Sequence, residues 1–191
     1  DSKYAMNQLG VLQDERGDLD GAEQWWRKGA ELGDADATRN LGLLLNNRGD
    51  LDGAEQWWRK AAELGNTDAT YDVGVLLNER GDLDGAEQWW RRAAELGNTD
   101  AMNNLGVLLM NERGDLDGAE PWFRKLVKLG NTDAMNNLGL LLNKRGDLDG
   151  AERWIRKAAE LGNEHARKNL EVLSRKRIAA EQSNGATRLP R

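Results

Sequence analysis

The chain has 191 residues, of which 39% are hydrophobic and 31% are charged, a composition typical of a folded protein with an extensive polar surface. The formal net charge of −6 disfavours nucleic acid as a partner, because phosphates attract positively charged surfaces. The sequence contains no cysteine and no apolar run of the roughly 18 residues that span a membrane, so we expect no disulfide, no zinc site built on cysteine and no membrane partner.

One stretch of sequence, GDLDGAEQWWRKAAELGN, is written five times with few substitutions. The copies begin at Gly17, Gly49, Gly81, Gly114 and Gly146, so their spacings are 32, 32, 33 and 32 residues. Self-similarity at such a period is typical of stacked repeats, in which each unit buries its apolar face against its neighbours. We therefore expect repeats at residues 3–33, 34–65, 66–97, 98–130 and 131–162.

Each period contains two helical patterns, as the second repeat illustrates. A first helix has an apolar stripe at Ala37, Leu41, Leu44 and Leu45. Gly49 suits the left-handed position just past the end of this helix, and Asp50 is placed to cap the next one. The second helix carries Trp58 on its apolar face and ends at Gly65. One period therefore predicts a helical hairpin.

A glycine also recurs inside the first helix of every repeat, at Gly10, Gly42, Gly74, Gly106 and Gly139. A glycine in a helix interior costs about 1 kcal/mol relative to alanine, so its repetition requires a compensating reason. We expect a neighbouring helix to approach so closely there that a side chain would block it.

The fourth repeat departs from this pattern in several places. Met110 is an extra residue at the end of its first helix, and Pro121 stands inside its second helix, where proline removes a backbone hydrogen bond. Phe123 replaces the second tryptophan, and Leu126-Val127 replaces the usual Ala-Ala. We expect these changes to compensate one another through a bent or shifted helix and larger side chains, with neutral drift as the alternative.

Residues 163–182 begin like a further first helix, but Glu171 stands where the packing glycine would be. We interpret this segment as a capping helix, the polar end that a stack of repeats requires. Residues 183–191 have the composition of a linker and are predicted as a C-terminal tail. The segment 164–191 holds 7 Lys/Arg against 3 Asp/Glu, so the C-terminal end is basic whereas the rest of the chain is acidic.

The repeat resembles the tetratricopeptide repeat over residues 3–162. In the second repeat the Leu-Gly pair of that family falls on Leu41-Gly42, its small residues fall on Ala54 and Ala61, and its aromatic residue falls on Trp58. The link AAELGNTDA, two residues shorter than in that family, is more similar to the related Sel-one-like repeat. The resemblance implies an all-α superhelical solenoid of five helix-turn-helix repeats and a capping helix.

Two tryptophans stand side by side in the second helix of most repeats. The second of each pair aligns with the aromatic core position of the family. The first, at Trp25, Trp57, Trp89, Trp122 and Trp154, lies one residue further round the helix. We expect each of these rings to pack against the neighbouring repeat with its indole N–H near water, and an outer aromatic ladder that recruits a ligand is the alternative.

Motifs that suggest enzymatic or metal chemistry are explained by the repeat. Arg-Gly-Asp occurs five times, starting at Arg16, Arg48, Arg80, Arg113 and Arg145, and we interpret it as a helix end followed by a helix cap, not as an adhesion motif. His165 is the only histidine. A zinc site or a Ser-His-Asp triad could therefore draw on only one imidazole. We therefore expect no metal, no cofactor and no enzymatic activity.

The candidate binding residues precede the Leu-Gly pair of each first helix, which lines the concave groove in tetratricopeptide arrays. One residue before the pair stand Gln8, Asn40, Asp72, Asn104 and Asn137, and two before it stand Asn7, Arg39, Tyr71, Asn103 and Asn136. An amide offers a donor and an acceptor, so it can grip the backbone of an extended peptide, and the resemblance implies this role for Asn40, Asn104 and Asn137. The alternative is that these residues only face solvent. We expect truncation of these three asparagines to abolish binding and to leave thermal stability nearly unchanged.

These observations predict a non-enzymatic scaffold that binds a protein or peptide in the concave groove. Acidic residues on the first helices, at Asp36, Asp68, Asp100 and Asp133, favour a basic or neutral partner. The alternative is a self-assembling repeat module, in which the uncapped N-terminal repeat or the basic C-terminal tail forms a homo-oligomer. We expect a cytoplasmic protein, and a removed leader stays open because the sequence begins at Asp1.

Overall fold

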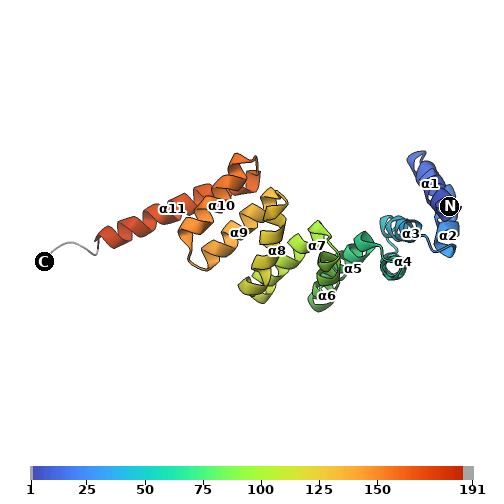
Figure 1. The fold of residues 1–191 in the computed structure, drawn as a ribbon, viewed down its shortest axis with the longest axis horizontal. Helices are drawn as coiled ribbons and strands as arrows, with labels where there is room; N and C mark the ends of the chain where they lie inside the picture. The colour runs from blue at the N-terminus through green and yellow to red at the C-terminus, as the bar shows by residue number, and fades with distance from the viewer. Residues whose placement is uncertain (1, 187–191) are drawn as a thin grey trace. The chain divides into compact units, whose positions relative to one another are not determined.

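The computed structural model describes residues 2–186 and the side chains of residues 2–175. Every regular element in these residues is helical (Figure 1), which confirms the predicted all-α class. The helices are α1 (Ser2–Glu15), α2 (Leu19–Glu31), α3 (Ala35–Asn47), α4 (Leu51–Glu63), α5 (Thr67–Glu79), α6 (Leu83–Glu95), α7 (Thr99–Leu108), the π-turn η1 (Leu109–Arg113), α8 (Leu116–Lys128), α9 (Thr132–Lys144), α10 (Leu148–Glu160) and α11 (Glu164–Ala186). We name the first helix of each repeat an A helix and the second a B helix.

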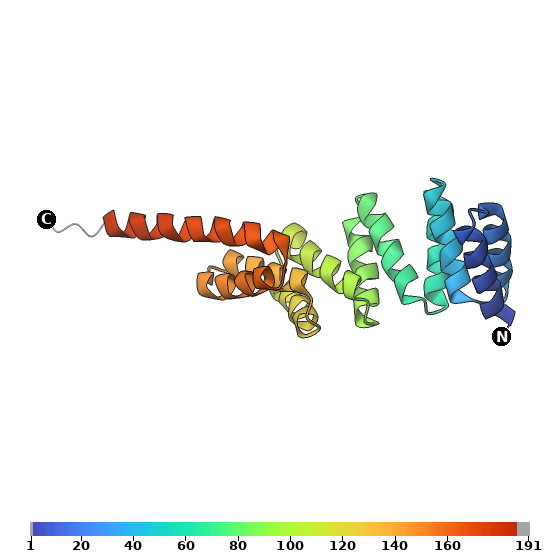
Figure 2. The ribbon, with the colours of Figure 1, turned by 90° about the horizontal axis from the view of Figure 1, so that it is seen from above.

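The chain divides into two compact units, Asp1–Met102 and Asn103–Arg191. The first contains the hairpins α1–α2, α3–α4 and α5–α6, which Figure 2 shows as pairs of antiparallel helices coloured from blue to green. The second contains η1 with α8, and then α9, α10 and α11. Successive repeats also pack on one another, α2 on α3 and α4 on α5 in the first unit, and α8 on α9 and α10 on α11 in the second. The hairpins of each unit therefore stack as a solenoid.

The turns have the predicted chemistry. Gly49 has φ +83°, the left-handed conformation that ends the A helix of the second repeat. The side chain of Asp50 then accepts a hydrogen bond from the backbone N–H of Gly53 at 2.9 Å and caps the B helix. A side chain at Gly53 would collide with the Asp50 carboxylate, which explains why a glycine recurs in the first turn of each B helix. The interpretation of Arg-Gly-Asp as a helix end and a cap is confirmed.

The glycine inside each A helix lies against the core residue of the B helix in the same repeat. A methyl group at Gly74 would lie 2.5 Å from Cδ1 and 2.6 Å from Nε1 of Trp90, closer than atoms can approach. The prediction of a close helix approach is confirmed, and the approaching group comes from the same hairpin, an aromatic ring at four of the five glycines and Ile155 at Gly139. The indole N–H of Trp90, like those of Trp26 and Trp58, is buried without a partner among the described residues, so this ring contributes through packing.

The core between the first two repeats shows how the hairpins stack. It joins residues of both repeats in one cluster, made of Ala22, Trp26, Ala30, Ala37, Leu41 and Leu44. Trp57, the first tryptophan of the second repeat, packs against this cluster from its half-buried position. Trp57 therefore packs on a core that the two repeats share, and the predicted exposure of the indole N–H groups to water stays a prediction.

The fourth repeat absorbs its extra residue without losing its helices. The π-turn η1 takes up the insertion, since its wider turn holds one more residue, and Met110 is buried within it. Helix α8 continues through Pro121, which is exposed. Phe123 and Leu126 are fully buried and replace the smaller or differently shaped residues of the other repeats.

The last helix is longer than the sequence predicts. It begins at Glu164 and reaches Ala186, four residues past the predicted end at residue 182. Ala166 and Leu173 of this helix are buried and Leu170 is half-buried, whereas Glu171 and Val172 are exposed. Residues 187–191 of the predicted tail lie outside the described part of the chain.

Candidate functional site

The asparagines of the A helices bind one another between adjacent repeats. Asn40 donates a hydrogen bond from Nδ2 to Oδ1 of Asn7 at 3.0 Å, and Asn137 donates in the same way to Asn103 at 3.0 Å. The acceptor Asn7 is buried, with 6% of its surface exposed. One amide proton of each donor is therefore committed to the neighbouring repeat.

The same positions form two further links. In the first unit Arg39 donates from Nε to Oδ2 of Asp72 at 2.7 Å, in place of an asparagine pair. In the second unit Asn169 of α11 donates from Nδ2 to Oδ1 of Asn136 at 2.9 Å. We name these four pairs, Asn7–Asn40, Arg39–Asp72, Asn103–Asn137 and Asn136–Asn169, the inter-repeat ladder. They hold each A helix in register with the next one in its unit.

The ion pair of the ladder lies in a partly desolvated environment. The side chain of Asp72 is only 12% exposed, and that of Arg39 is 27% exposed. Burial raises the pKa of Asp72, although the hydrogen bond from Arg39 acts in the opposite direction. The two charges balance, so Arg39 is not a free cation for a ligand.

The ladder changes the expectation for the predicted binding residues. The sequence predicts nearly unchanged stability on truncation of the asparagines, but the hydrogen bonds of Asn40 and Asn137 lead us to expect a loss of stability at these two positions. Gln8 is exposed on α1, whereas Tyr71 and Asn104 are half-buried. Seven of the ten predicted residues therefore belong to the inter-repeat ladder, and Gln8 lies exposed outside it.

A row of aliphatic residues on the A helices was missed in the sequence. They directly follow the Leu-Gly pairs and are all half-buried, at Val11, Leu43, Val75, Val107 and Leu140. Each lies three residues after the polar residue that precedes the Leu-Gly pair, at Gln8, Asn40, Asp72, Asn104 and Asn137. The polar row and the aliphatic row therefore share one face of the helix. We name this surface, in each of the two units, the A-helix face. The signal was present in the sequence, as an apolar residue at the same place in every repeat.

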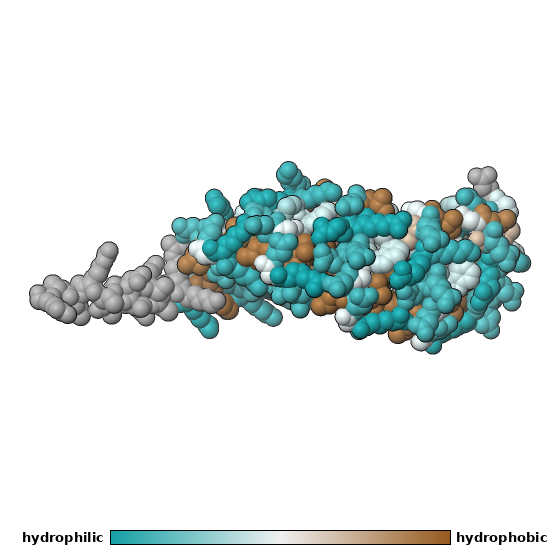
Figure 3. All heavy atoms as spheres, turned by 90° about the horizontal axis from the view of Figure 1, so that it is seen from below, coloured by the Kyte–Doolittle hydropathy of each residue, from teal (hydrophilic) through white to brown (hydrophobic). Residues whose placement is uncertain are grey.

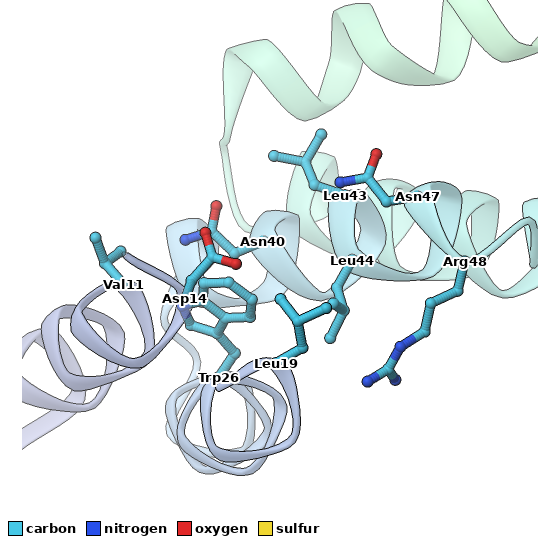
Figure 4. Close-up of a pocket in the computed structure, with 9 residues that line it drawn as sticks. All are labelled: Val11, Asp14, Leu19, Trp26, Asn40, Leu43, Leu44, Asn47 and Arg48. Atoms are coloured by element: carbon cyan, nitrogen blue, oxygen red, sulfur yellow. The ribbon is translucent and has the colours of Figure 1, made fainter. Parts of the chain in front are cut away.

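The A-helix face is hollowed between the first two repeats. A cavity of about 270 Å³ lies among α1, α2 and α3 and is lined by Val11, Asp14, Leu19, Trp26, Asn40, Leu43, Leu44, Asn47 and Arg48. Figure 4 shows Asp14 and Asn40 above the Trp26 ring and Leu19 and Leu44 to the right of it. Apolar walls and a few polar groups are the usual composition of a binding pocket.

Two more kinds of polar contact join the repeats. Asn66 caps α5 through its side-chain oxygen and donates its Nδ2 to Asp36 of the preceding repeat at 2.8 Å. Arg48 of the Arg-Gly-Asp motif donates to Glu23 at 2.5 Å and to Asp20 at 3.0 Å, both in the preceding repeat. The hydrogen bonds from Arg48 and Arg27 lower the pKa of Glu23. Arg80 and Arg145 make the corresponding contacts in later repeats.

The outer tryptophans of the B helices contact cations. Lys60, three residues after Trp57 in the same helix, lies 4.9 Å from the centre of its ring, and Arg27 of the preceding repeat lies at 5.9 Å. Arg59 similarly lies 5.0 Å from Trp89 of the next repeat. These rings are therefore already covered in part by the protein itself. Figure 3 shows polar residues over most of the viewed face, with smaller apolar patches between them.

The described residues lack two features that would indicate other functions. They contain no group of three or more His, Cys, Asp and Glu side chains that could hold a metal ion. No helix in this part of the chain combines the length and apolar character needed to cross a membrane. The predicted cytoplasmic location stays a prediction.

The fold and its interfaces define the class as an all-helical solenoid of hairpin repeats. Two sequence profiles of the tetratricopeptide repeat match the chain, one at residues 35–66, 99–130 and 132–166, the other at residues 4–28 and 62–92. The protein belongs to the tetratricopeptide repeat family, with a relationship to Sel1-like repeats. A comparison with curated protein sequences finds no match.

Solved structures support this assignment. A Sel1 repeat protein from Oxalobacter formigenes is 31% identical, with a TM-score of 0.72 over 88% of this chain and 74% of that one. The protective antigen c5321 of uropathogenic Escherichia coli, which has an SLR fold, is 26% identical with a TM-score of 0.76, and the match covers 91% of this chain but 42% of c5321. YrrB, a tetratricopeptide repeat protein with an unusual peptide-binding site, is 25% identical with a TM-score of 0.65 over 90% of each chain.

Proposed function

We propose that this protein is a non-enzymatic scaffold that holds an extended segment of a partner protein against its A-helix face. Its membership of the tetratricopeptide repeat family supports a role as a protein-interaction scaffold. That the partner binds on the A-helix face is our inference. The similarity to YrrB, whose peptide-binding site is described as unusual, is consistent with a peptide ligand.

The observation that carries this proposal is the pairing of two rows on one helix face. The half-buried residues Leu43 and Val75 offer apolar surface, and Asn40 keeps its Oδ1 as an acceptor after its Nδ2 has bonded to Asn7. An extended backbone needs acceptors and donors at regular intervals, while its side chains need apolar pockets. The repeat supplies both with the period of the A helices.

The charges along this face favour a basic or neutral segment. Asp36 of the second repeat is exposed and bonds only to the neutral amide of Asn66, so its negative charge is retained. Asp68 and Asp133 have equivalent partners in Asn98 and Asn163. The one cation of the predicted row, Arg39, is balanced by Asp72.

The test is selection of binding peptides from a displayed random library, followed by measurement on variants. Leu43→Gln and Val75→Thr each make the A-helix face more polar with little change in volume. We expect each substitution to weaken the binding of the selected peptides by at least about fivefold, which corresponds to a difference in binding free energy of roughly 1 kcal/mol. Gln56→Ala, at an exposed position of α4, is the matched control and should bind as the wild type does.

Two results contradict the proposal. Either the library yields no binding peptide, or the selected peptides bind the Leu43 and Val75 variants with unchanged affinity. Circular dichroism of each variant separates loss of binding from loss of fold.

Self-assembly is the second candidate, and one observation favours it. Tyr4 is 62% exposed and Leu12 is 40% exposed on α1, whereas Leu44, which occupies the position of Leu12 in the second repeat, is 4% exposed because it packs on the preceding repeat. A second copy that docks on α1 would cover this edge. Light scattering across protein concentrations tests the idea, and a monomer at every concentration contradicts it.

A further inference from the structure

We propose that the cavity among α1, α2 and α3 is a pocket for one lysine or arginine side chain of the bound partner. The inference rests on the proposed function and specifies it, since it names the residue that anchors the segment in the first repeat. It draws on the charge, the hydrogen-bonding groups and the walls of the cavity.

The cavity carries one unbalanced negative charge. Its lining includes two charged residues, Asp14 and Arg48. Arg48 is bound by Asp20 and Glu23, and Glu23 is also bound by Arg27, so these four charges sum to zero. Figure 4 shows the Arg48 side chain extending away from Trp26. Asp14 is exposed, and its carboxylate has no hydrogen-bond or ion-pair partner among the described residues.

The neutral polar group beside Asp14 is also an acceptor. Asn40 has committed one Nδ2 proton to Oδ1 of Asn7, and its own Oδ1 accepts no hydrogen bond among the described residues, so this oxygen is available as an acceptor. Figure 4 shows Asp14 and Asn40 on the same side of the Trp26 ring. A carboxylate next to an amide oxygen selects a donor, and a cationic donor gains the charge interaction as well.

The walls suit the rest of such a side chain. Val11, Leu19, Leu43 and Leu44 are apolar, and lysine and arginine bury their aliphatic stems on such surfaces while their charged ends remain near polar groups. Trp26 lines the cavity as well, but it is only 5% exposed and contributes apolar wall. A cavity of about 270 Å³ accommodates a single long side chain, not a folded element.

The charge is a property of the first repeat. Asp14 stands four residues after the packing glycine Gly10, and the corresponding positions of other repeats are Asn46, Asn78 and Asn143. Gln13, beside it, replaces the leucine of the other repeats. The acidic character of the pocket therefore does not follow from the consensus and is specific to this site.

The test uses the full chain, isotope-labelled for NMR, and four blocked pentapeptides of Gly-Ala-Xaa-Ala-Gly. Xaa is arginine, lysine, citrulline or norleucine, so that charge, hydrogen bonding and apolar bulk vary separately. The signals observed are the indole N–H of Trp26 and the side-chain amides of Asn40 and Asn47. We expect saturable shifts with arginine and lysine, and at least about fivefold weaker binding of citrulline and norleucine.

Two variants complete the test. Asp14→Asn keeps the shape of the side chain and removes its charge, so the arginine peptide should bind it no better than the citrulline peptide does. Glu31→Gln removes an exposed carboxylate of the same unit that does not line the cavity, and its binding should equal that of the wild type. Equal affinity for arginine and citrulline, unchanged binding to the Asp14 variant, or no binding of the cationic peptides overturns the proposal.

The two proposals fail differently. The library peptides can bind the Leu43 and Val75 variants more weakly than the wild type but bind the Asp14 variant with unchanged affinity. In that case the A-helix face remains the binding surface and only the pocket assignment is wrong. If the arginine peptide binds the cavity but no library peptide depends on Val75, the pocket stands and the extended binding mode is wrong.

Discussion

Replacement of Gly74 by alanine tests whether close packing explains the glycine inside each A helix. Helix propensity alone favours alanine by about 1 kcal/mol. The new methyl group, however, would lie 2.5 Å from Cδ1 of Trp90, nearly an ångström short of the 3.4 Å at which ordinary contact begins. Trp90 is 4% exposed and has little room to move, and overpacking of this kind costs about 1–3 kcal/mol. We expect the packing cost to exceed the propensity gain, with a net loss of up to about 2 kcal/mol.

A double-mutant cycle separates the two contributions. Trp90→Ala should itself destabilise the protein by about 3–5 kcal/mol, because it leaves a cavity. In that background nothing opposes the new methyl group, so Gly74→Ala should become stabilising by about 1 kcal/mol. The measurement is urea denaturation followed by far-UV circular dichroism, which does not depend on tryptophan emission. If Gly74→Ala stabilises the wild type, or if its effect keeps the same sign in both backgrounds, the packing explanation is wrong.

Three further substitutions test the polar contacts between repeats. Asn40→Ala leaves the buried Asn7 without its donor and should cost about 1–2 kcal/mol in urea denaturation. Arg39→Ala leaves Asp72 unpaired, so its pKa rises further, and the loss of about 1–3 kcal/mol at neutral pH should shrink as pH falls through that pKa. Arg48→Ala removes the largest cause of the lowered pKa of Glu23, so the wild type should exceed the variant in stability above that pKa and lose the advantage below it or at high salt.

The helices and their turns could be predicted from the sequence because their signals are local. Gly49 and Asp50 act on the residues next to them, and the observed φ of +83° and the bond to Gly53 follow from these residue types. Trp58 at a helical spacing from small residues predicted the core. These features require no knowledge of how one repeat meets another.

The inter-repeat ladder and the cavity could not be predicted from the same local signals. Nothing within one repeat indicates that the Nδ2 of Asn40 bonds to Asn7, since the pair forms only when two hairpins dock in a particular register. The contact of Arg48 with Asp20 and Glu23 likewise depends on that docking. The cavity depends on it too, because its lining comes from three helices of two repeats.

The contacts between repeats indicate how binding specificity can reside in a nearly uniform array. Arg48, Asn66 and Asn40 each contact the preceding repeat, so the polar residues that recur with the period largely encode stacking. A residue with that role cannot vary freely to suit a ligand, because its replacement weakens an interface. Positions that break the period are free of this constraint, and Asp14 is such a position on the A-helix face. A search for ligand selectivity in this protein should therefore begin with residues that differ between repeats, not with those that repeat.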